Sequence, residues 1–237
     1  MRIARFQFNM LPVNTYVLWD TASRECAIVD AGCYYPKEEE TLAEFIDDNK
    51  LTVKYLLATH LHFDHCFGNS FVAKKYGVML CAAEADEFLL QNMIRQCESF
   101  GIPFRGEIQP IGHYISDKDT FDLGHEKLKT IAISGHSPGS MAFYAPDSGF
   151  VLSGDALFQM SIGRTDLPGG NHHQLVESIR TRLLTLPKET IVYPGHGPET
   201  EILYFPNHLY DPIKSALTIE WLHAHFSTVA TSHSVNR

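Results

Sequence analysis

Histidine and aspartate are crowded into one short segment of the 237-residue chain. The segment 59–65 reads THLHFDH and offers four potential metal ligands: His60, His62, Asp64 and His65. Side chains alternate along an extended backbone, so the first three are expected on one side and His65 one step further, where the next helix begins. Imidazole nitrogens and carboxylate oxygens in this pattern can serve two neighbouring metal ions.

Three further ligand-type residues follow the ends of predicted strands. Each stands beside a glycine: His136 in SGHSPGS, Asp155 in SGD and His196 in PGHG. In α/β proteins, side chains that follow the carboxyl ends of strands gather at one edge of the sheet, and glycine lets the backbone turn sharply there. The sequence therefore predicts that four strand ends converge on one metal site.

The elements that must position these residues are short apolar strands alternating with helices. Turn residues separate the first three strands, which predicts an antiparallel start. Apolar residues recur at helical spacing after Pro36 and again after Asn171, which is expected to cap its helix. We predict strands at 2–8, 13–19, 26–30, 53–59, 78–82, 127–134, 141–145, 150–153 and 190–193, and helices from residue 36, at 66–76, at 83–100 and at 171–186.

The composition argues against several classes of protein. The chain carries 19 Lys+Arg against 28 Asp+Glu, a formal net charge of −9, so nucleic acid is not expected as a partner. No stretch is long and apolar enough to span a membrane, and no secretion signal is visible. Five cysteines without a C-x-x-C pair fit reduced thiols, and a cytoplasmic protein is expected.

The motifs THLHFDH, SGHSPGS, SGD and PGHG, in this order, resemble the metal-binding motifs of the metallo-β-lactamase-fold superfamily over roughly residues 10–200. GDALF at 154–158 and SIGRTD at 161–166 are similar to the glyoxalase II (hydroxyacylglutathione hydrolase) branch, especially its short bacterial members, and also to persulfide dioxygenases. The resemblance implies an α/β (α+β) fold, a four-layer αβ/βα sandwich with the metals at one edge. We expect a single hydrolase domain over 1–237, whose C-terminal segment 201–237 resembles nothing recognised.

The resemblance also implies a role for each ligand. It assigns the first metal to His60, His62 and His136. It assigns the second metal to Asp64, His65 and His196, with Asp155 as the bridge between the two. Asp64 and Asp155 would also be the catalytic carboxylates. The cofactors expected are two divalent metal ions, zinc first, with iron or manganese as alternatives.

Outside the ligand motifs, Arg164 stands where the resemblance places a basic side chain that binds a substrate carboxylate. An ion pair between Arg164 and Asp166 is the alternative, because acidic partners near arginine are common. His172 and His173 match no ligand motif and are expected at the start of a helix. The apolar spacing at 213, 217 and 221 predicts a terminal amphipathic helix that packs on the domain or on a second subunit of a homodimer.

The activity that the resemblance implies is hydrolysis of a small thioester by a metal-bound hydroxide. Two divalent ions lower the pKa of a shared water and polarise a carbonyl, and a thiolate leaves with little need of protonation. The thiol carrier is glutathione or another small thiol. The alternatives are a persulfide dioxygenase with one iron on His60, His136 and Asp155, a lactone hydrolase, and a non-catalytic metal-stabilised scaffold.

Overall fold

The computed structural model describes residues 1–204, so the terminal helix predicted around 213–221 and most of the segment 201–237 lie outside the described residues. The helices are α1 Pro36–Asp48, α2 Asn69–Tyr76, α3 Glu87–Gln91, α4 Met93–Ser99 and α5 His172–Ser178. The strands are β1 Arg2–Phe8, β2 Val13–Trp19, β3 Glu25–Val29, β4 Thr52–Leu57, β5 Leu80–Ala82, β6 Ile111–Tyr114, β7 Thr120–Leu123, β8 Glu126–Ala132, β9 Met141–Ala145, β10 Phe150–Gly154, β11 Leu157–Phe158, β12 Ser161–Ile162, β13 Ile191–Pro194 and β14 Thr200–Glu201.

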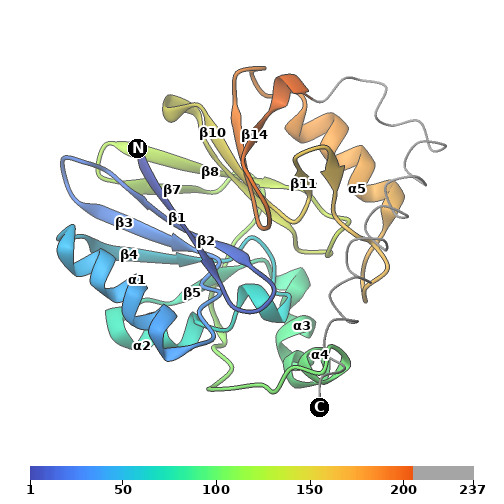
Figure 1. Cartoon of the computed structure of the whole chain (residues 1–237). Helices are drawn as coiled ribbons and strands as arrows, with labels where there is room; N and C mark the ends of the chain where they lie inside the picture. Colours follow the sequence, from blue (N-terminus) through green and yellow to red (C-terminus); the bar gives the residue numbers. More distant parts are fainter. Residues whose placement is uncertain (205–237) are drawn as a thin grey trace, which may run out of the picture.

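These strands form two six-stranded sheets that lie face to face (Figure 1), with β11 and β12 as a separate hairpin. The first sheet has the order β1-β2-β3-β4-β5-β6 and the second the order β14-β13-β10-β9-β8-β7. In the first sheet β1 pairs with β2 and β2 with β3 in antiparallel register, whereas β3, β4, β5 and β6 run parallel. The predicted antiparallel start is therefore confirmed.

Strand β2 is buried along its whole length, because both faces of the first sheet are covered. Val17 packs in one core cluster with Leu42 of α1, whereas Tyr16 and Leu18 pack in a second cluster with Phe143 of the second sheet. Successive side chains of a strand point to opposite faces, so this one strand contributes to two cores.

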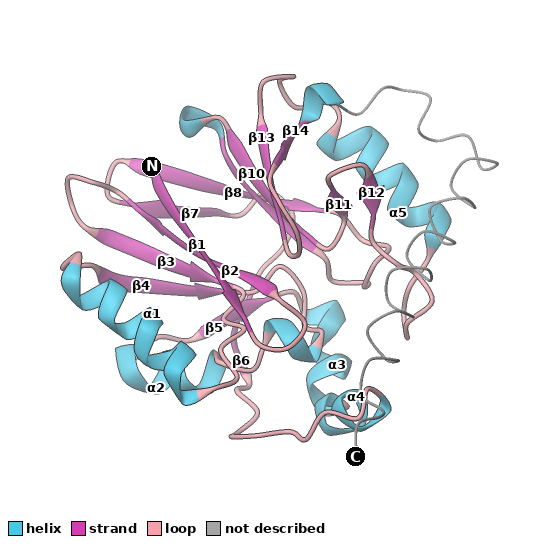
Figure 2. Ribbon diagram, viewed as in Figure 1, coloured by secondary structure: helices cyan, strands magenta, loops and turns pink. Residues whose placement is uncertain are grey.

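The outer face of the second sheet is covered by a helix as well. Val151 of β10 and Val192 of β13 pack with Leu175 of α5 and with Ile179 and Leu183 beyond it. The helices α1 and α2 lie on one side of the paired sheets and α5 on the other (Figure 2). This order of layers confirms the predicted αβ/βα sandwich of the metallo-β-lactamase type.

Two predicted helices in the first half of the chain differ in extent from the observed ones. The region 83–100 is divided at Asn92, whose side-chain amide donates to the carbonyl of Phe88 at 2.8 Å and so competes with the helical hydrogen-bond ladder. The helix predicted at 66–76 begins at Asn69, because a 3-10 turn at Phe63–His65 precedes it. The short strands β6, β7, β11, β12 and β14 are additional to those predicted.

The helix after Asn171 begins where it was predicted, with Asn171 as its N-cap. The side chain of Asn171 accepts a hydrogen bond from the N–H of Gln174 at 3.0 Å, as an N-cap should. Helix α5 ends at Ser178 and continues as a π-helical turn at Ile179–Leu183, where the wider turn keeps both terminal residues in the core. Within residues 1–204, no helix combines the length and the apolar character needed to cross a membrane.

Candidate metal centre

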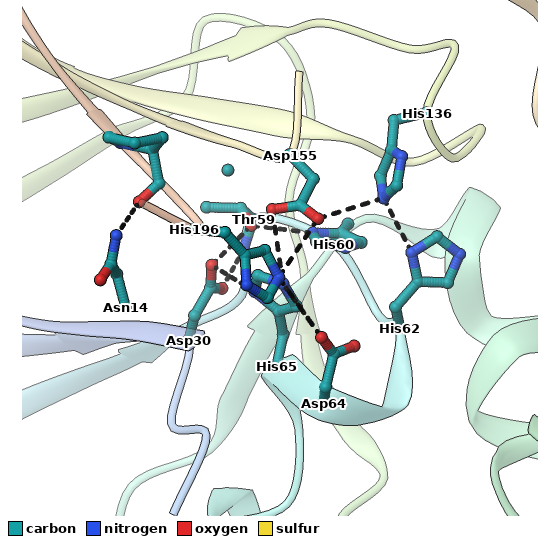
Figure 3. A network of polar contacts seen from close by, with 12 residues as sticks. Asn14, Asp30, Thr59, His60, His62, Asp64, His65, His136, Asp155 and His196 are labelled. Carbon is teal, nitrogen blue, oxygen red and sulfur yellow. Dashed lines mark hydrogen bonds and ion pairs between the residues drawn. The ribbon is translucent and has the colours of Figure 1, made fainter. Parts of the chain in front are cut away.

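The structure brings the seven predicted ligands together where the two sheets meet at one edge (Figure 3). The segment after β4 contributes four of them, and the segments after β8, β10 and β13 contribute one each. The seven are His60, His62, Asp64, His65, His136, Asp155 and His196. Their convergence is what the ends of four apolar strands predict.

Three histidines form a first group, the three-histidine group. The ligand atoms of His60, His62 and His136 lie within 4.8 Å of one another, and all three residues are buried. Nδ1 of His62 is 2.9 Å from Nε2 of His136. Burial, reinforced by the neighbouring rings, lowers the pKa of His60 well below its usual range and that of His62 to about 3, so both rings are neutral near pH 7.

Asp64, His65 and His196 form a second group, again with ligand atoms within 4.8 Å of one another. Nε2 of His196 lies 3.3 Å from Nε2 of His65 and 3.4 Å from Oδ2 of Asp64. Burial by itself would lower the pKa of His65, but Asp155 and Asp64 raise it well above its usual range, and the same carboxylates raise the pKa of His196. The side chain of His196 is 29% exposed, so the centre opens to solvent on this side.

Asp155 stands between the two groups. Its Oδ2 lies 3.7 Å from Nε2 of His136 and 3.5 Å from Nε2 of His196, and its Oδ1 lies 3.5 Å from Nε2 of His65. Burial would raise the pKa of this carboxyl, but His196 and His65 hold it well below its usual range. An ionised carboxylate that faces both groups has the position of a bridging ligand.

Asp30 and Thr59 orient the rings of His60 and His65. The hydroxyl of Thr59 donates to Oδ2 of Asp30 at 2.7 Å, so its oxygen accepts from Nδ1 of His60 at 3.0 Å. Nδ1 of His65 donates to Oδ2 of Asp30 at 3.0 Å. With Nδ1 engaged in both rings, Nε2 is the nitrogen left to bind a metal when the ring is neutral.

His136 is oriented in the same way by a backbone group, because its Nδ1 donates to the carbonyl of Arg164 at 2.8 Å. Among the described residues, three buried polar atoms at the centre have no hydrogen-bond partner: Nε2 of His60, Nε2 of His62 and Oδ1 of Asp155. Each such buried atom costs about 1–3 kcal/mol in free energy of folding. Metal ions would satisfy Nε2 of His60 and Oδ1 of Asp155, while His62 faces His136 with its Nδ1, the nitrogen that it would offer to a metal. This donor set of imidazole nitrogens and carboxylate oxygens fits divalent ions such as zinc, iron or manganese.

Asp30 is a functional residue that the motif search misses. It follows β3 and is followed by Ala31 and Gly32, so it carries the same signal of a strand end, a polar side chain and a nearby glycine as the predicted ligands. Its Oδ1 accepts from the N–H of Thr59 at 2.7 Å, and its backbone φ of +53° lies in the left-handed region. The sequence signal was present, but the role is to hold ligands in place.

Asn14 of β2 holds the loop of His196. Its side-chain amide donates to the carbonyls of Pro194 at 2.9 Å and Gly197 at 2.8 Å. The hydroxyl of Tyr16, two residues further along the strand, also donates to the carbonyl of Pro194, at 2.7 Å. No spacing in the sequence points to Asn14, because its partners are backbone atoms 180 or more positions away.

Gly154 is required by a close approach at the end of β10. Its φ is +51°, and a Cβ at this position would lie only 2.5 Å from Oγ1 of Thr59. A side chain here would displace the hydroxyl that orients His60. The glycine before Asp155 thus serves the three-histidine group as well as the bridging carboxylate.

Arg164 and His172 lie outside both groups. The guanidinium of Arg164 is half-exposed and forms two hydrogen bonds with Asp166, Nε to Oδ1 at 2.7 Å and a terminal nitrogen to Oδ2 at 2.6 Å. This is the ion pair that the sequence offers as the alternative, and the binding of a substrate carboxylate by Arg164 stays a prediction. His172 is the exposed first residue of α5.

Comparison with known sequences supports a metal-dependent centre. The family model described as "Metallo-beta-lactamase superfamily" matches residues 9–196. The chain is 34% identical over 203 residues to the "Probable metallo-hydrolase YqgX" of Bacillus subtilis (strain 168), covering 86% of this chain and 93% of that protein. It is 33% identical over 190 residues to the "Hydroxyacylglutathione hydrolase GloC" of Haemophilus influenzae, covering 80% of this chain and 87% of that protein.

Solved structures give the same picture. The "BLEG-1 B3 metallo-beta-lactamase" is similar with a TM-score of 0.79 and 30% identity, covering 90% of this chain and 100% of that one. The protein TTHA1623, solved "in a di-iron-bound form", is similar with a TM-score of 0.74 and 29% identity, covering 85% of this chain and 96% of that one.

The position of Asp155 predicts how its loss affects metal binding. We expect Asp155→Ala to deplete both metals and to abolish activity, because its carboxylate faces both groups. His172→Ala is the control, since this exposed histidine lies outside them and should leave the metal content unchanged. Elemental analysis after purification under metal-replete conditions measures both variants, and an equal loss of metal in the two would contradict the ligand assignment.

The pKa shifts predict which group releases protons on metal binding. His60 and His62 are already neutral near pH 7, whereas the raised pKa values of His65 and His196 favour their protonated forms. Metal must displace those protons, so the affinity of the second group should fall as the pH is lowered from roughly 8 to 6, while that of the three-histidine group changes less. Zinc calorimetry in two buffers of different ionisation enthalpy counts the protons, and two binding steps with the same pH dependence would disprove this difference.

Proposed function

Because this chain belongs to the metallo-beta-lactamase superfamily, we propose that it is a metal-dependent hydrolase that holds two divalent ions, zinc first, and cleaves a small thioester of the hydroxyacylglutathione type. The observation that carries the proposal is the pair of ligand groups on either side of Asp155. Similarity to the hydrolase GloC supports the thioester as substrate. Two divalent ions supply a water with a pKa lowered to about 7 and a Lewis acid for the carbonyl oxygen.

The residues of the two groups suit different tasks. The three-histidine group contains no carboxylate, so its residues would not offset the positive charge of an ion bound there. That charge would be available to polarise a substrate carbonyl. The second group contains the Asp64 carboxylate and opens to solvent at His196, the side from which substrate and water can enter. The ring of Phe158 lies 6.4 Å from the ring of His196, centroid to centroid, and offers an apolar wall beside this opening for the acyl part of a substrate.

We further propose that the protein is cytoplasmic and that residues 1–237 act as one domain. All five cysteines, which lie within the described residues, are unpaired and buried, as suits a reducing compartment. Iron is the alternative to zinc that metal analysis must separate, since the similar protein TTHA1623 was solved with two irons. The two alternative activities, persulfide dioxygenase and lactone hydrolase, would use the same motif residues. Measurements of thiol release, oxygen uptake and lactone hydrolysis separate them from the thioesterase.

The metal-loaded protein should release free thiol from a hydroxyacyl thioester of glutathione without consuming oxygen. Thiol release is measured with a chromogenic thiol reagent, and dissolved oxygen with an electrode in parallel reactions that contain glutathione persulfide. Activity should be lost on chelation and return when zinc is added. Oxygen uptake with the persulfide and one iron per chain would establish the dioxygenase instead. Hydrolysis of a lactone or a β-lactam without hydrolysis of the thioester would also overturn the proposal.

Arg164 is predicted to bind a carboxylate on the thiol carrier. Arg164→Met should raise KM for acidic thioesters by roughly 10–150-fold with little change in kcat, because a charge-assisted hydrogen bond contributes about 1.5–3 kcal/mol. Neutral thioesters should be nearly unaffected. The matched control is Asp166→Asn, which removes the partner and leaves the guanidinium free for substrate. A lower melting temperature and slower turnover of every substrate in both variants would show that the pair is only structural.

A further inference from the structure

The carboxylate of Asp86 is fully buried and joins the two loops that carry the three-histidine group. Asp86 ends the 3-10 turn Glu84–Asp86 after β5 and belongs to no ligand motif. Its Oδ1 accepts from the N–H of Gly139 at 2.6 Å, and its Oδ2 accepts from the hydroxyl of Ser137 at 2.6 Å and from the N–H of Leu61 at 3.2 Å. We propose that Asp86 is a positioning residue that sets the metal affinity of the three-histidine group, an inference that rests on the proposed metal-dependent function.

The three donors to Asp86 come from both sides of the group. Leu61 stands between His60 and His62, and Ser137 follows His136 directly. Once Nδ1 of His62 and Nε2 of His136 both act as metal ligands, neither carries a hydrogen, so these two atoms cannot hold each other at their 2.9 Å separation. The Asp86 carboxylate holds the two loops in their relative position from behind the ligands, whether or not these two nitrogens contact each other, and so prepares them for a metal.

The loop of His136 is shaped to admit this carboxylate. A Cβ on Gly139 would lie 2.7 Å from Cγ of Asp86 and 2.9 Å from its backbone nitrogen. The glycine therefore allows the loop to approach within hydrogen-bond distance of the side chain. Burial raises the pKa of the Asp86 carboxyl, although its three hydrogen-bond donors lower it. Burying this carboxylate therefore costs free energy of folding.

Asparagine cannot reproduce the set of contacts. If its NH2 group took the place of Oδ1, it would face the N–H of Gly139; if it took the place of Oδ2, it would face the N–H of Leu61. Either orientation leaves one loop with an unpaired backbone donor and a repulsive contact. Asp86→Asn is thus nearly isosteric but weakens the attachment of one of the two ligand loops.

The test is a zinc titration of the metal-free full chain against a chromophoric chelator, which resolves two binding steps. His62→Ala identifies the step that belongs to the three-histidine group. Asp86→Asn should weaken that same step by about 10–100-fold and leave the other step unchanged. Ser137→Ala, which removes one of the three hydrogen bonds, should shift the same step by less and serves as the milder variant should Asp86→Asn fold poorly.

The matched control is Asp20→Asn. Asp20 is also buried and its carboxylate accepts from the N–H groups of Ala22 and Ser23, but it lies at the opposite end of β2 from the centre. This variant should change neither zinc step. If Asp86→Asn and Ser137→Ala lower the melting temperature of the metal-free chain while both zinc steps shift equally or not at all, Asp86 is merely structural and the inference is wrong. A wild-type chain that shows no two-step binding would overturn the binuclear function itself, which distinguishes the two failures.

Discussion

The geometry of the centre depends above all on the carboxylate of Asp30. It accepts hydrogen bonds from the backbone and hydroxyl of Thr59 and from the ring of His65. Through Thr59 it also fixes the ring of His60, so one buried side chain sets the tautomers of a ligand in each group. Asp30 directly follows β3 and has a left-handed backbone conformation. The end of a single central strand therefore controls ligand orientation on both sides of Asp155.

The two groups differ in how they exist without metal. In the three-histidine group, burial keeps His60 and His62 neutral, and their unpaired nitrogens are an unfavourable feature of the metal-free chain. In the second group, carboxylates favour a proton on His65, which then occupies the place of a positive ion. Metal would therefore satisfy the orphaned Nε2 of His60 in one group and exchange with protons in the other. The same fold thus presents one group that is deprotonated before metal binds and one group in which metal competes with protons.

The sequence predicts well which residues converge on the centre, because their signal is local. Each ligand motif combines residue types and spacing within a few positions, and the apolar strand before it indicates where the chain must end and turn. The segment after β4 and the loop of His136 are identified in this way without any knowledge of the partner sheet. The short apolar strands and the helical spacing of α1 and α5 predict strands with helices packed outside them, whereas the layer order was implied only by the resemblance of the motifs to a known family. These features depend on periodicity and turn chemistry, which a single sequence displays.

The residues that hold the ligands were harder to predict because their partners are distant and are often backbone groups. Asn14 donates to carbonyls of the loop at Pro194, and the carbonyl of Arg164 accepts from His136. A backbone carbonyl has no residue type, so no motif can indicate it. The division of the helix at Asn92 has a similar origin, since a local side-chain hydrogen bond overrides a favourable apolar pattern. Such contacts become visible only when the two sheets are seen together.

Each ligand group takes residues from both halves of the chain, and this couples metal binding to the packing of the two sheets. The first sheet supplies His60 and His62 to one group and Asp64 and His65 to the other, while the loops of the second sheet complete both. An ion in either group would therefore cross-link the sheets at an edge that Asn14 already fastens with two hydrogen bonds. Because metal binds the folded chain and not the separated halves, its binding free energy adds to the free energy of unfolding. By the same linkage, a change that loosens the loops around one ligand group should lower the metal affinity of that group, even where it touches no ligand.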